Sequence, residues 1–302
     1  MKKIISYILF LSSFVFAQDF VLSDIEPLLA DTKFSMVKVS PDGNYLAAGA
    51  ENNSGLFLLD HSGKQLRILS EKPGSGWGFS WNGNADKIAF RENQKASGSE
   101  LIISCLAVYD LKASEVYRTE YSGSTGLPYW NSGGHRLHYS ENSVPKEISY
   151  NEGGKGNYYA IGDNVLMTDN SIVSEAVRQI VRKPEDYILN IALSPSEEYL
   201  AVEVASLGLF VINTGNGKII DFGKYEMPVW FNSDLLLTAL VQDDGQRFID
   251  SDLFLLQISN QKEINISAGT GQMCFYPSVD KEGNVYFVNE DGNLFRGKIS
   301  LR

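Results

Sequence analysis

Apolar and polar residues along the chain repeat one unit, made of a short apolar strand, a tight polar turn and a second apolar strand. Six copies can be aligned on the residue that opens the turn, namely Ser40, Trp81, Trp130, Ser194, Trp230 and Pro277. Successive copies lie 41, 49, 64, 36 and 47 residues apart. These intervals vary too much for a stacked solenoid, but they suit a β-propeller, in which each blade is a four-stranded meander with loops of variable length.

The turns and the strands that follow them support the same architecture. In the first copy Pro41 sets one backbone angle, Asp42 accepts backbone N–H groups, and Gly43 supplies a positive φ. A second hairpin follows in four of the units, as in residues 55–60 and 65–69. We therefore predict an all-β chain that forms a single propeller with six four-stranded blades. The interval of 64 residues leaves room for a further degenerate blade, so five and seven blades stay open as alternatives.

Two stretches interrupt the repeat, and the segment before it fits a closing strand. Residues 143–156 look like a polar, Gly-rich insertion, and residues 174–181 fit either a helical turn or a strand. The last unit ends one strand short at Arg302, whereas residues 20–29, ahead of the first unit, include apolar positions. We predict that part of this N-terminal segment supplies the missing strand and closes the ring, which removes the open sheet edges.

The first residues have the pattern of a signal peptide. Lys2 and Lys3 precede an apolar stretch, residues 4–16, and Ala17 completes a tripeptide of the kind that signal peptidase cleaves. The alternative, a membrane anchor, is less favoured because a span needs about 20 apolar residues. We expect cleavage before Gln18 and a periplasmic or secreted protein without membrane insertion. The predicted organisation is a signal peptide (1–17), a segment with the closing strand (18–35) and a propeller (36–302).

Charge, cysteine and histidine content narrow the possible partners. The chain carries 37 acidic and 26 basic residues, a formal net charge of −11, without a basic cluster, so we exclude nucleic acid as a partner. Cys105 and Cys274 both lie in apolar strand sequences, and we favour two buried free thiols over the disulfide that export permits. His135 and His138, three apart on a predicted strand, point to opposite faces and should not share a metal ion.

The first copy of the repeat, Ser40-Pro-Asp-Gly-Asn-Tyr-Leu-Ala, resembles the WD-repeat-like propeller units of the TolB family. The copies that open at Trp81 and Trp130 match with Asn-Gly-type turns, and the copy at Ser194 keeps only Ser-Pro. The resemblance covers roughly residues 36 to 301. TolB carries an α/β domain ahead of its propeller, and 18–35 are too few residues for one, so the resemblance implies an isolated propeller. Exported propellers of this kind bind proteins or envelope components.

Catalytic motifs are missing from the sequence, and acidic turns offer a hint of a metal site. Neither a Gly-x-Ser-x-Gly elbow nor a Walker phosphate loop occurs. The turns at residues 280–284 and 289–293 resemble those of sugar-lactonase propellers, a family that binds a divalent metal at its channel mouth. We favour solvated hairpin turns without a cofactor, and calcium bound at these turns is the alternative.

Aromatic and arginine residues in the predicted loops between blades are the candidate binding residues. In a propeller these loops surround the channel mouth, where Tyr, Trp and Arg side chains can anchor a protein or glycan. The candidates, which we expect on one face, are Trp77, Arg91, Tyr121, Tyr187, Tyr225 and Arg247. For each single aromatic residue, packing between blades is the competing interpretation.

The leading functional hypothesis is a non-catalytic, monomeric scaffold propeller that binds a protein or an envelope component. A metal-dependent hydrolase of the sugar-lactonase type is the main alternative, and it requires three or four carboxylate or Asn side chains that converge at the channel. A regulatory propeller that acts beside a separately encoded enzyme is a third hypothesis.

Overall fold

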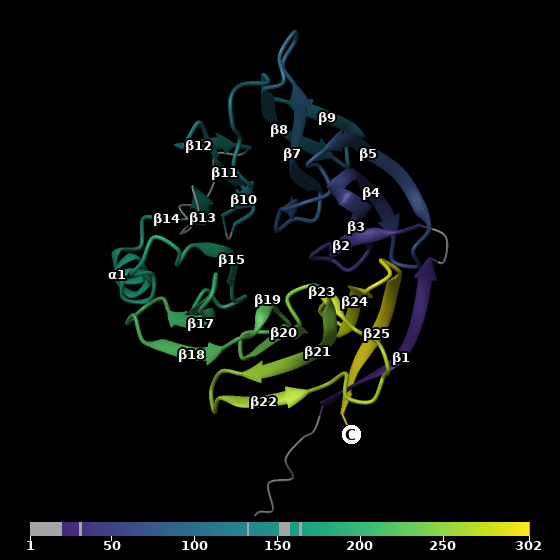
Figure 1. The fold of residues 1–302 in the computed structure, drawn as a ribbon, viewed down its shortest axis with the longest axis vertical. Helices are drawn as coiled ribbons and strands as arrows, with labels where there is room; N and C mark the ends of the chain where they lie inside the picture. Colours follow the sequence, from purple (N-terminus) through teal and green to yellow (C-terminus); the bar gives the residue numbers. More distant parts are fainter. Residues whose placement is uncertain (1–19, 30–31, 132, 151–157, 163–164, 302) are drawn as a thin grey trace, which may run out of the picture.

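The strands are arranged as blades around a central axis (Figure 1). The computed structural model describes residues 20–29, 32–131, 133–150, 158–162 and 165–301, so the predicted signal peptide lies outside the described residues. The prediction of an all-β propeller with six blades is confirmed. Within the described residues, five blades have four strands and the third has three. Neighbouring strands within a blade pair antiparallel, as the hairpin pattern predicts.

Each of the first five blades runs outward from the channel in sequence order. Blade 1 consists of β2 (Phe34–Val39), β3 (Tyr45–Ala50), the short 3-10 turn η1 (Glu51–Asn53), β4 (Ser54–Asp60) and β5 (Gln65–Pro73). Blade 2 consists of β6 (Ser80–Trp81), β7 (Lys87–Lys95), β8 (Ile102–Asp110) and β9 (Glu115–Arg118). Blade 3 consists of β10 (Tyr129–Trp130), β11 (Arg136–Glu141) and β12 (Val144–Ser149).

The second half of the ring repeats this arrangement. Blade 4 consists of β15 (Ile188–Leu193), β16 (Tyr199–Val204), β17 (Gly208–Asn213) and β18 (Ile219–Gly223). Blade 5 consists of β19 (Glu226–Trp230), β20 (Leu235–Asp243), β21 (Phe248–Gln257) and β22 (Lys262–Asn265). Blade 6 consists of β23 (Phe275–Val279), β24 (Asn284–Val288), β25 (Leu294–Leu301) and the N-terminal strand β1 (Phe20–Leu29).

A two-stranded hairpin and a helix occupy the long interval between blades 3 and 4. β13 (Tyr159–Gly162) pairs with β14 (Val165–Thr168), and α1 (Ser171–Ile180) follows. Asn170 caps the helix, because its side chain accepts hydrogen bonds from the backbone N–H groups two and three residues further on. The apolar side of α1 packs against the hairpin and blade 4. The segment that fitted either a helical turn or a strand is therefore a helix.

The interpretation of residues 143–156 as an insertion is wrong for its first part, which forms β12. This strand pairs with β11 and contributes Lys146 and Glu147, which form ion pairs across the sheet with Glu141 at 3.7 Å and with Arg136 at 3.3 Å. β12 lies at the exposed outer edge of blade 3, where its backbone pairs with β11 along six residues and its side chains are mostly exposed rather than alternately apolar. A search for apolar strands therefore overlooks it.

The N-terminal strand closes the ring, as the sequence predicts. β1 pairs antiparallel with β25 and forms the fourth strand of blade 6. Leu22 is buried in the core that blades 5 and 6 share, and its backbone N–H donates to the carbonyl of Ile266 at 2.7 Å. The closing strand thus links blade 6 to blade 5 as well as completing it.

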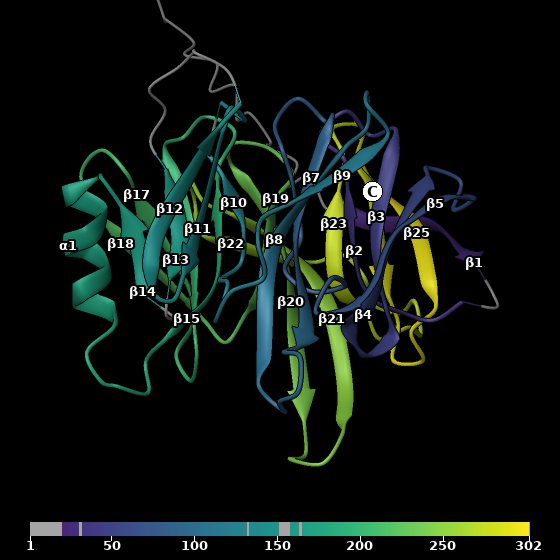
Figure 2. The same cartoon turned by 90° about the horizontal axis from the view of Figure 1, so that it is seen from above.

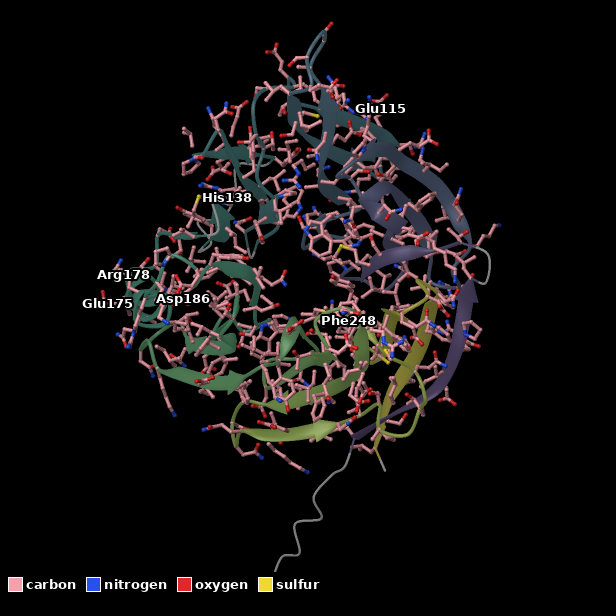
Figure 3. The ribbon with its side chains drawn as sticks, in the orientation of Figure 1. Glu115, His138, Glu175, Arg178, Asp186 and Phe248 are labelled. Carbon is pink, nitrogen blue, oxygen red and sulfur yellow. The ribbon has the colours of Figure 1, made fainter. Side chains whose placement is uncertain are left out.

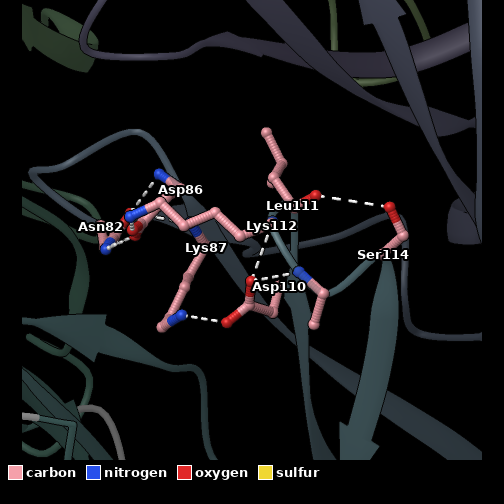
Figure 4. A network of polar contacts seen from close by, with 8 residues as sticks. Asn82, Asp86, Lys87, Asp110, Leu111, Lys112 and Ser114 are labelled. Atoms are coloured by element: carbon pink, nitrogen blue, oxygen red, sulfur yellow. Dashed lines mark hydrogen bonds and ion pairs between the residues drawn. The ribbon is translucent and has the colours of Figure 1, made fainter.

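The ring has two distinct faces, because successive strands of a blade run in opposite directions. The tight turns between first and second strands lie on one face, here called the turn face, and the connections between blades lie on the other, here called the crossover face. Figure 4 shows the turn face of blade 2, where Lys112 donates to Asp86 at 2.6 Å and Lys87 pairs with Asp110. On the crossover face the β20–β21 hairpin extends beyond the other blades (Figure 2).

Indole groups join neighbouring blades at three positions that open the repeated turns. The Nε1 atom of Trp81 donates to the carbonyl of Lys38 at 3.0 Å, from blade 2 to blade 1. The corresponding bonds in blades 3 and 5 run from Trp130 to the carbonyl of Ser80 at 3.2 Å and from Trp230 to the carbonyl of Ala192 at 2.8 Å. The repeat therefore encodes contacts between blades as well as turns.

Two further expectations concern cysteines and membranes. Cys105 and Cys274 are both buried free thiols, which confirms the prediction. Among the described residues, no helix is long and apolar enough to cross a membrane.

Candidate functional site in the central channel

The central channel contains two cavities that meet at a ring of shared side chains. The cavity on the crossover side has a volume of about 570 Å³, and the cavity on the turn side has a volume of about 540 Å³. The residues that line both cavities, here called the channel girdle, are Trp77, Leu127, Leu189, Asn190, Met227 and Tyr276. Volumes of this size fall within the range of about 300–1,000 Å³ that is usual for small-molecule sites.

β-Bulges turn three girdle side chains toward the channel. The pairing registers of β15, β19 and β23 shift at Leu189, at Met227 and at Tyr276. Met227 and Tyr276 have φ angles of +57° and +50°, in the left-handed region that bulky residues rarely adopt. Such a backbone costs about 1–3 kcal/mol per residue and is found most often where a side chain must be held for function.

Contacts among the girdle residues fix their positions. The rings of Trp77 and Tyr276 pack edge to face with centroids 5.5 Å apart. The backbone N–H of Tyr276 donates to the Sδ atom of Met227 at 3.2 Å. The girdle is therefore a preformed and mostly apolar part of the channel wall.

Blade 2 contributes a guanidinium group to the crossover-side cavity. Because β6 has only two residues and pairs with Ile88 and Ala89, this inner strand ends short of Arg91 on β7. The Nη1 atom of Arg91 donates to the carbonyl of Thr125 at 3.2 Å, and its buried Nε atom has no acceptor among the described residues. Burial lowers the pKa of Arg91. The group thus has donor capacity left for an anion.

Blades 4 and 5 contribute two carboxyl groups to the same cavity. Glu203 is 4% exposed, and its Oε2 atom accepts hydrogen bonds from Asn190 Nδ2 at 2.7 Å and from the backbone N–H of Met227 at 2.9 Å. Burial raises the pKa of Glu203, and these hydrogen bonds offset the rise only in part. Burial, and then repulsion from the carboxylates of Glu203 and Asp243, also raises the pKa of Glu226. In the described part of the chain, the Glu226 carboxyl group has neither a hydrogen-bond donor nor a cation beside it.

An amine lies in the turn-side cavity. Lys38 on β2 lines this cavity, and its Nζ atom is 5.7 Å from the centroid of the Phe79 ring. Indole rings of Trp81 and Trp130 line the same cavity. Burial lowers the pKa of Lys38 to about 8. Part of this amine is therefore unprotonated and nucleophilic near neutral pH.

The structure brings two of the six predicted binding residues together in the channel. Trp77 and Arg91 both line the crossover-side cavity, although Arg91 lies within β7 rather than in a loop. Tyr187 is 41% exposed and directly precedes Ile188 and Leu189, which line the cavity. These three residues lie at or beside the channel.

The other three predicted residues make contacts elsewhere. The Tyr121 hydroxyl donates to the carboxylate of Glu92 at 2.8 Å, and the buried Tyr225 donates to Glu263 at 2.7 Å. Packing between strands and blades, the competing interpretation, describes both tyrosines. Arg247 is exposed in the β20–β21 turn.

Sequence analysis missed Glu203, Glu226 and the bulged girdle positions. Glu203 interrupts the apolar run 200–204, and a lone carboxylate in such a strand signals a buried polar group. Met227 and Tyr276 each precede a proline, which cannot donate to a strand ladder and therefore signals a bulge.

In the acidic turns proposed to bind calcium, side-chain oxygens accept hydrogen bonds from the backbone of the same turn. Asp280 and Asn289 use their Oδ1 atoms to accept backbone N–H groups within their own turns. The residues that the structure describes hold no group of three or more His, Cys, Asp and Glu side chains that could bind a metal ion. Calcium binding and the lactonase-type hydrolase stay predictions.

Exposed apolar side chains gather on the crossover face. Phe248 and Ile249, at the start of β21, are 55% and 47% exposed, and Phe248 lies near the centre of the ring in Figure 3. Further members on blades 2 and 4 are Leu101, Ile102, Tyr187, Leu189 and Leu207. We call these residues, with Phe248 and Ile249, the crossover-face residues. Apolar side chains that are exposed on one face are surface that a binding partner can bury.

Comparison with known proteins establishes the fold alone. No family model and no curated protein sequence matches the chain. Among solved structures, the β-propeller domain of Cps50 (Swd1) from Myceliophteria thermophila superposes with a TM-score of 0.52, covering 91% of this chain and 100% of that domain at 11% sequence identity. The chain therefore has the β-propeller fold.

Proposed function

We propose that the chain is an exported, non-catalytic scaffold propeller that binds a protein of the cell envelope through its crossover face. The observation that carries this proposal is the set of crossover-face residues, which three different blades present on one side of the ring. Burial of such apolar groups against a partner is the main source of affinity in protein interfaces. The propeller fold supports the proposal because its loops can vary without disturbing the blades.

The β20–β21 hairpin adds a charge pattern to this surface. Asp243, Asp244 and Asp250 flank the apolar pair Phe248 and Ile249. The acidic rim favours a partner surface that is apolar at its centre and basic around it, because complementary charge speeds encounter and orients the complex.

Capture from envelope extracts tests this function. The mature chain with Phe248→Ser and Ile249→Ser should lose the partner that the wild-type chain retains. The matched control carries Leu66→Ser and Ile68→Ser on β5, two apolar residues of similar exposure that lie outside the crossover face. If the hairpin variant captures the same partner as the wild type, or the control loses it, the crossover face is not the binding surface.

Export and family relationship are part of the same proposal. The pattern of residues 1–17 supports removal of a signal peptide, and N-terminal sequencing of the exported chain should begin at Gln18. The turn from Ser40 to Gly43 supports a relationship to TolB-like propellers. A chain that retains residues 1–17 after fractionation would contradict the export proposal.

A further inference from the structure

The crossover-side cavity has chemistry that the binding of a protein at the rim does not use. Arg91 belongs to blade 2 and Glu226 to blade 5, two blades that lie on nearly opposite sides of the ring in Figure 1, and both residues line the cavity. Neither charged group has a full set of hydrogen-bond or ion-pair partners among the described residues. Each wall therefore favours a ligand group of opposite charge.

The guanidinium wall favours a carboxylate. Arg91 has one neutral acceptor, the Thr125 carbonyl, and its buried Nε atom has none in the described structure. A planar guanidinium binds a carboxylate through two parallel N–H bonds, and such charge-assisted bonds are roughly twice as strong as neutral ones. Ser124 and Ser140 line the cavity on the same side and offer hydroxyl groups beside that position.

The acidic wall favours a protonated amine. Glu203 and Glu226 repel one another, and the carboxyl group of Glu226 lacks a donor in the described part of the chain. An ammonium group placed between them would supply donors to Glu226 and to the Oε1 atom of Glu203, and it would relieve the repulsion. A divalent metal would need a third acidic or imidazole ligand, and the described residues do not supply one here.

The middle of the cavity is apolar and limits the size of the ligand. Trp77, Met227, Tyr276 and Leu127 form this part of the wall. We propose that the crossover-side cavity binds a dipeptide with apolar side chains, a zwitterion whose two charged ends are separated along the chain, with its carboxylate on Arg91 and its ammonium group at Glu203 and Glu226. A volume of about 570 Å³ accommodates such a molecule.

Calorimetric titration with capped dipeptides tests both ends of the ligand on the unmodified protein. Leu-Phe should bind the mature chain, and N-acetyl-Leu-Phe and Leu-Phe-amide, which lack the ammonium group and the carboxylate, should each bind at least about tenfold more weakly. Equal affinity for all three dipeptides, free leucine that binds as tightly as Leu-Phe, or no binding of Leu-Phe up to about 10 mM, would each overturn the proposal.

Single substitutions on each wall show which wall binds the carboxylate and which binds the ammonium group of the dipeptide. Arg91→Met should abolish the preference for the acid over the amide, and Glu226→Gln should abolish the preference for the amine over its acetylated form. Arg247→Met, at an exposed arginine, is the matched control and should keep both preferences. If Arg91→Met keeps the preference for the acid, the assignment is wrong. If either variant fails to fold in a thermal melt, the capped dipeptides on the wild type decide.

The Phe248 and Ile249 variant should retain dipeptide binding, which separates this inference from the proposed function.

Discussion

Glu92 is fully buried between blades 1 and 2, and its replacement should destabilise the ring far more than replacement of an exposed glutamate. Its Oε1 atom accepts from Ser70 Oγ at 2.7 Å and from Arg118 Nη2 at 2.9 Å. Its Oε2 atom accepts from Arg118 Nε at 2.8 Å and from the Tyr121 hydroxyl at 2.8 Å. One carboxylate thus joins the last strand of blade 1, two strands of blade 2 and the connection that follows.

The size of the stability loss can be estimated because Glu92→Gln leaves the donors of Ser70, Arg118 and Tyr121 without a negatively charged acceptor. Removing one partner of a fully buried ion pair costs about 3–5 kcal/mol, but the Arg118 side chain is 40% exposed and its charge is partly screened, so the loss here should be about 3 kcal/mol or less. The free energy of unfolding of Glu92→Gln, measured by urea denaturation of the mature chain, should fall by that amount. The matched control is Glu175→Gln, because Glu175 forms an exposed ion pair with Arg178 at 2.7 Å on α1 (Figure 3). That control should change stability by less than about 0.5 kcal/mol.

The pH dependence gives an independent check. Burial alone raises the pKa of Glu92, but hydrogen bonds from Arg118, Ser70 and Tyr121 outweigh it and hold the pKa below its usual value. A lowered pKa stabilises the folded state above the unfolded pKa of about 4.3, and this contribution is lost as pH falls through the folded pKa. The difference between wild type and Glu92→Gln should therefore be largest near pH 7 and shrink below about pH 4. Equal stability at pH 7, or a difference that does not change with pH, would refute the reasoning.

Two further predictions concern the channel and the packing of blade 1. The methylation rate of Lys38 should rise with pH and level off above its pKa of about 8, because about a fifth of its amine is already unprotonated at pH 7.4. Peptide mass spectrometry measures the rate at each pH, and a rate that keeps rising about tenfold per pH unit up to pH 10 would contradict the lowered pKa. Gly49→Ala should destabilise the chain by at least about 1–3 kcal/mol, because the new Cβ would lie 2.0 Å from the carbonyl oxygen of Gly76. Gly215→Ala, where the nearest atom is 3.5 Å away, should have little effect on the urea midpoint, and similar losses in both variants would show that the close approach is not the cause.

The turns and the ring closure could be predicted because their causes are local in the sequence. Ser40 accepts from the backbone N–H of Tyr45, and Gly43 has a φ of +77°, as the turn pattern requires. β1 fills the place that the short last unit left open. β12 could not be found in the same way, because it pairs with β11 through its backbone at an exposed edge, where its side chains do not need to be apolar.

The channel could not be predicted because it depends on where strands end and bulge. Arg91 reaches the cavity because β6 begins only at Ser80 and does not extend back to cover Arg91, and Glu203 and Glu226 line one cavity because they lie on adjacent blades. The sequence made Tyr121 and Arg91 equal candidates for binding residues in loops. In the structure the Tyr121 hydroxyl donates to the buried carboxylate of Glu92, whereas Arg91 lines the cavity. Residue type alone does not separate these two outcomes.

The pairing of β1 with β25 also affects how the chain can fold as it is made. Synthesis delivers β1 long before its partner β25, which lies far along the chain. Until then Leu22 and its neighbours have no sheet to join, and blade 6 exposes an unpaired edge. The last step is a contact between segments almost a whole chain apart, which makes closure slow. A newly made chain therefore spends its most aggregation-prone interval as an open ring, and this is the interval in which a chaperone would have the greatest effect on yield.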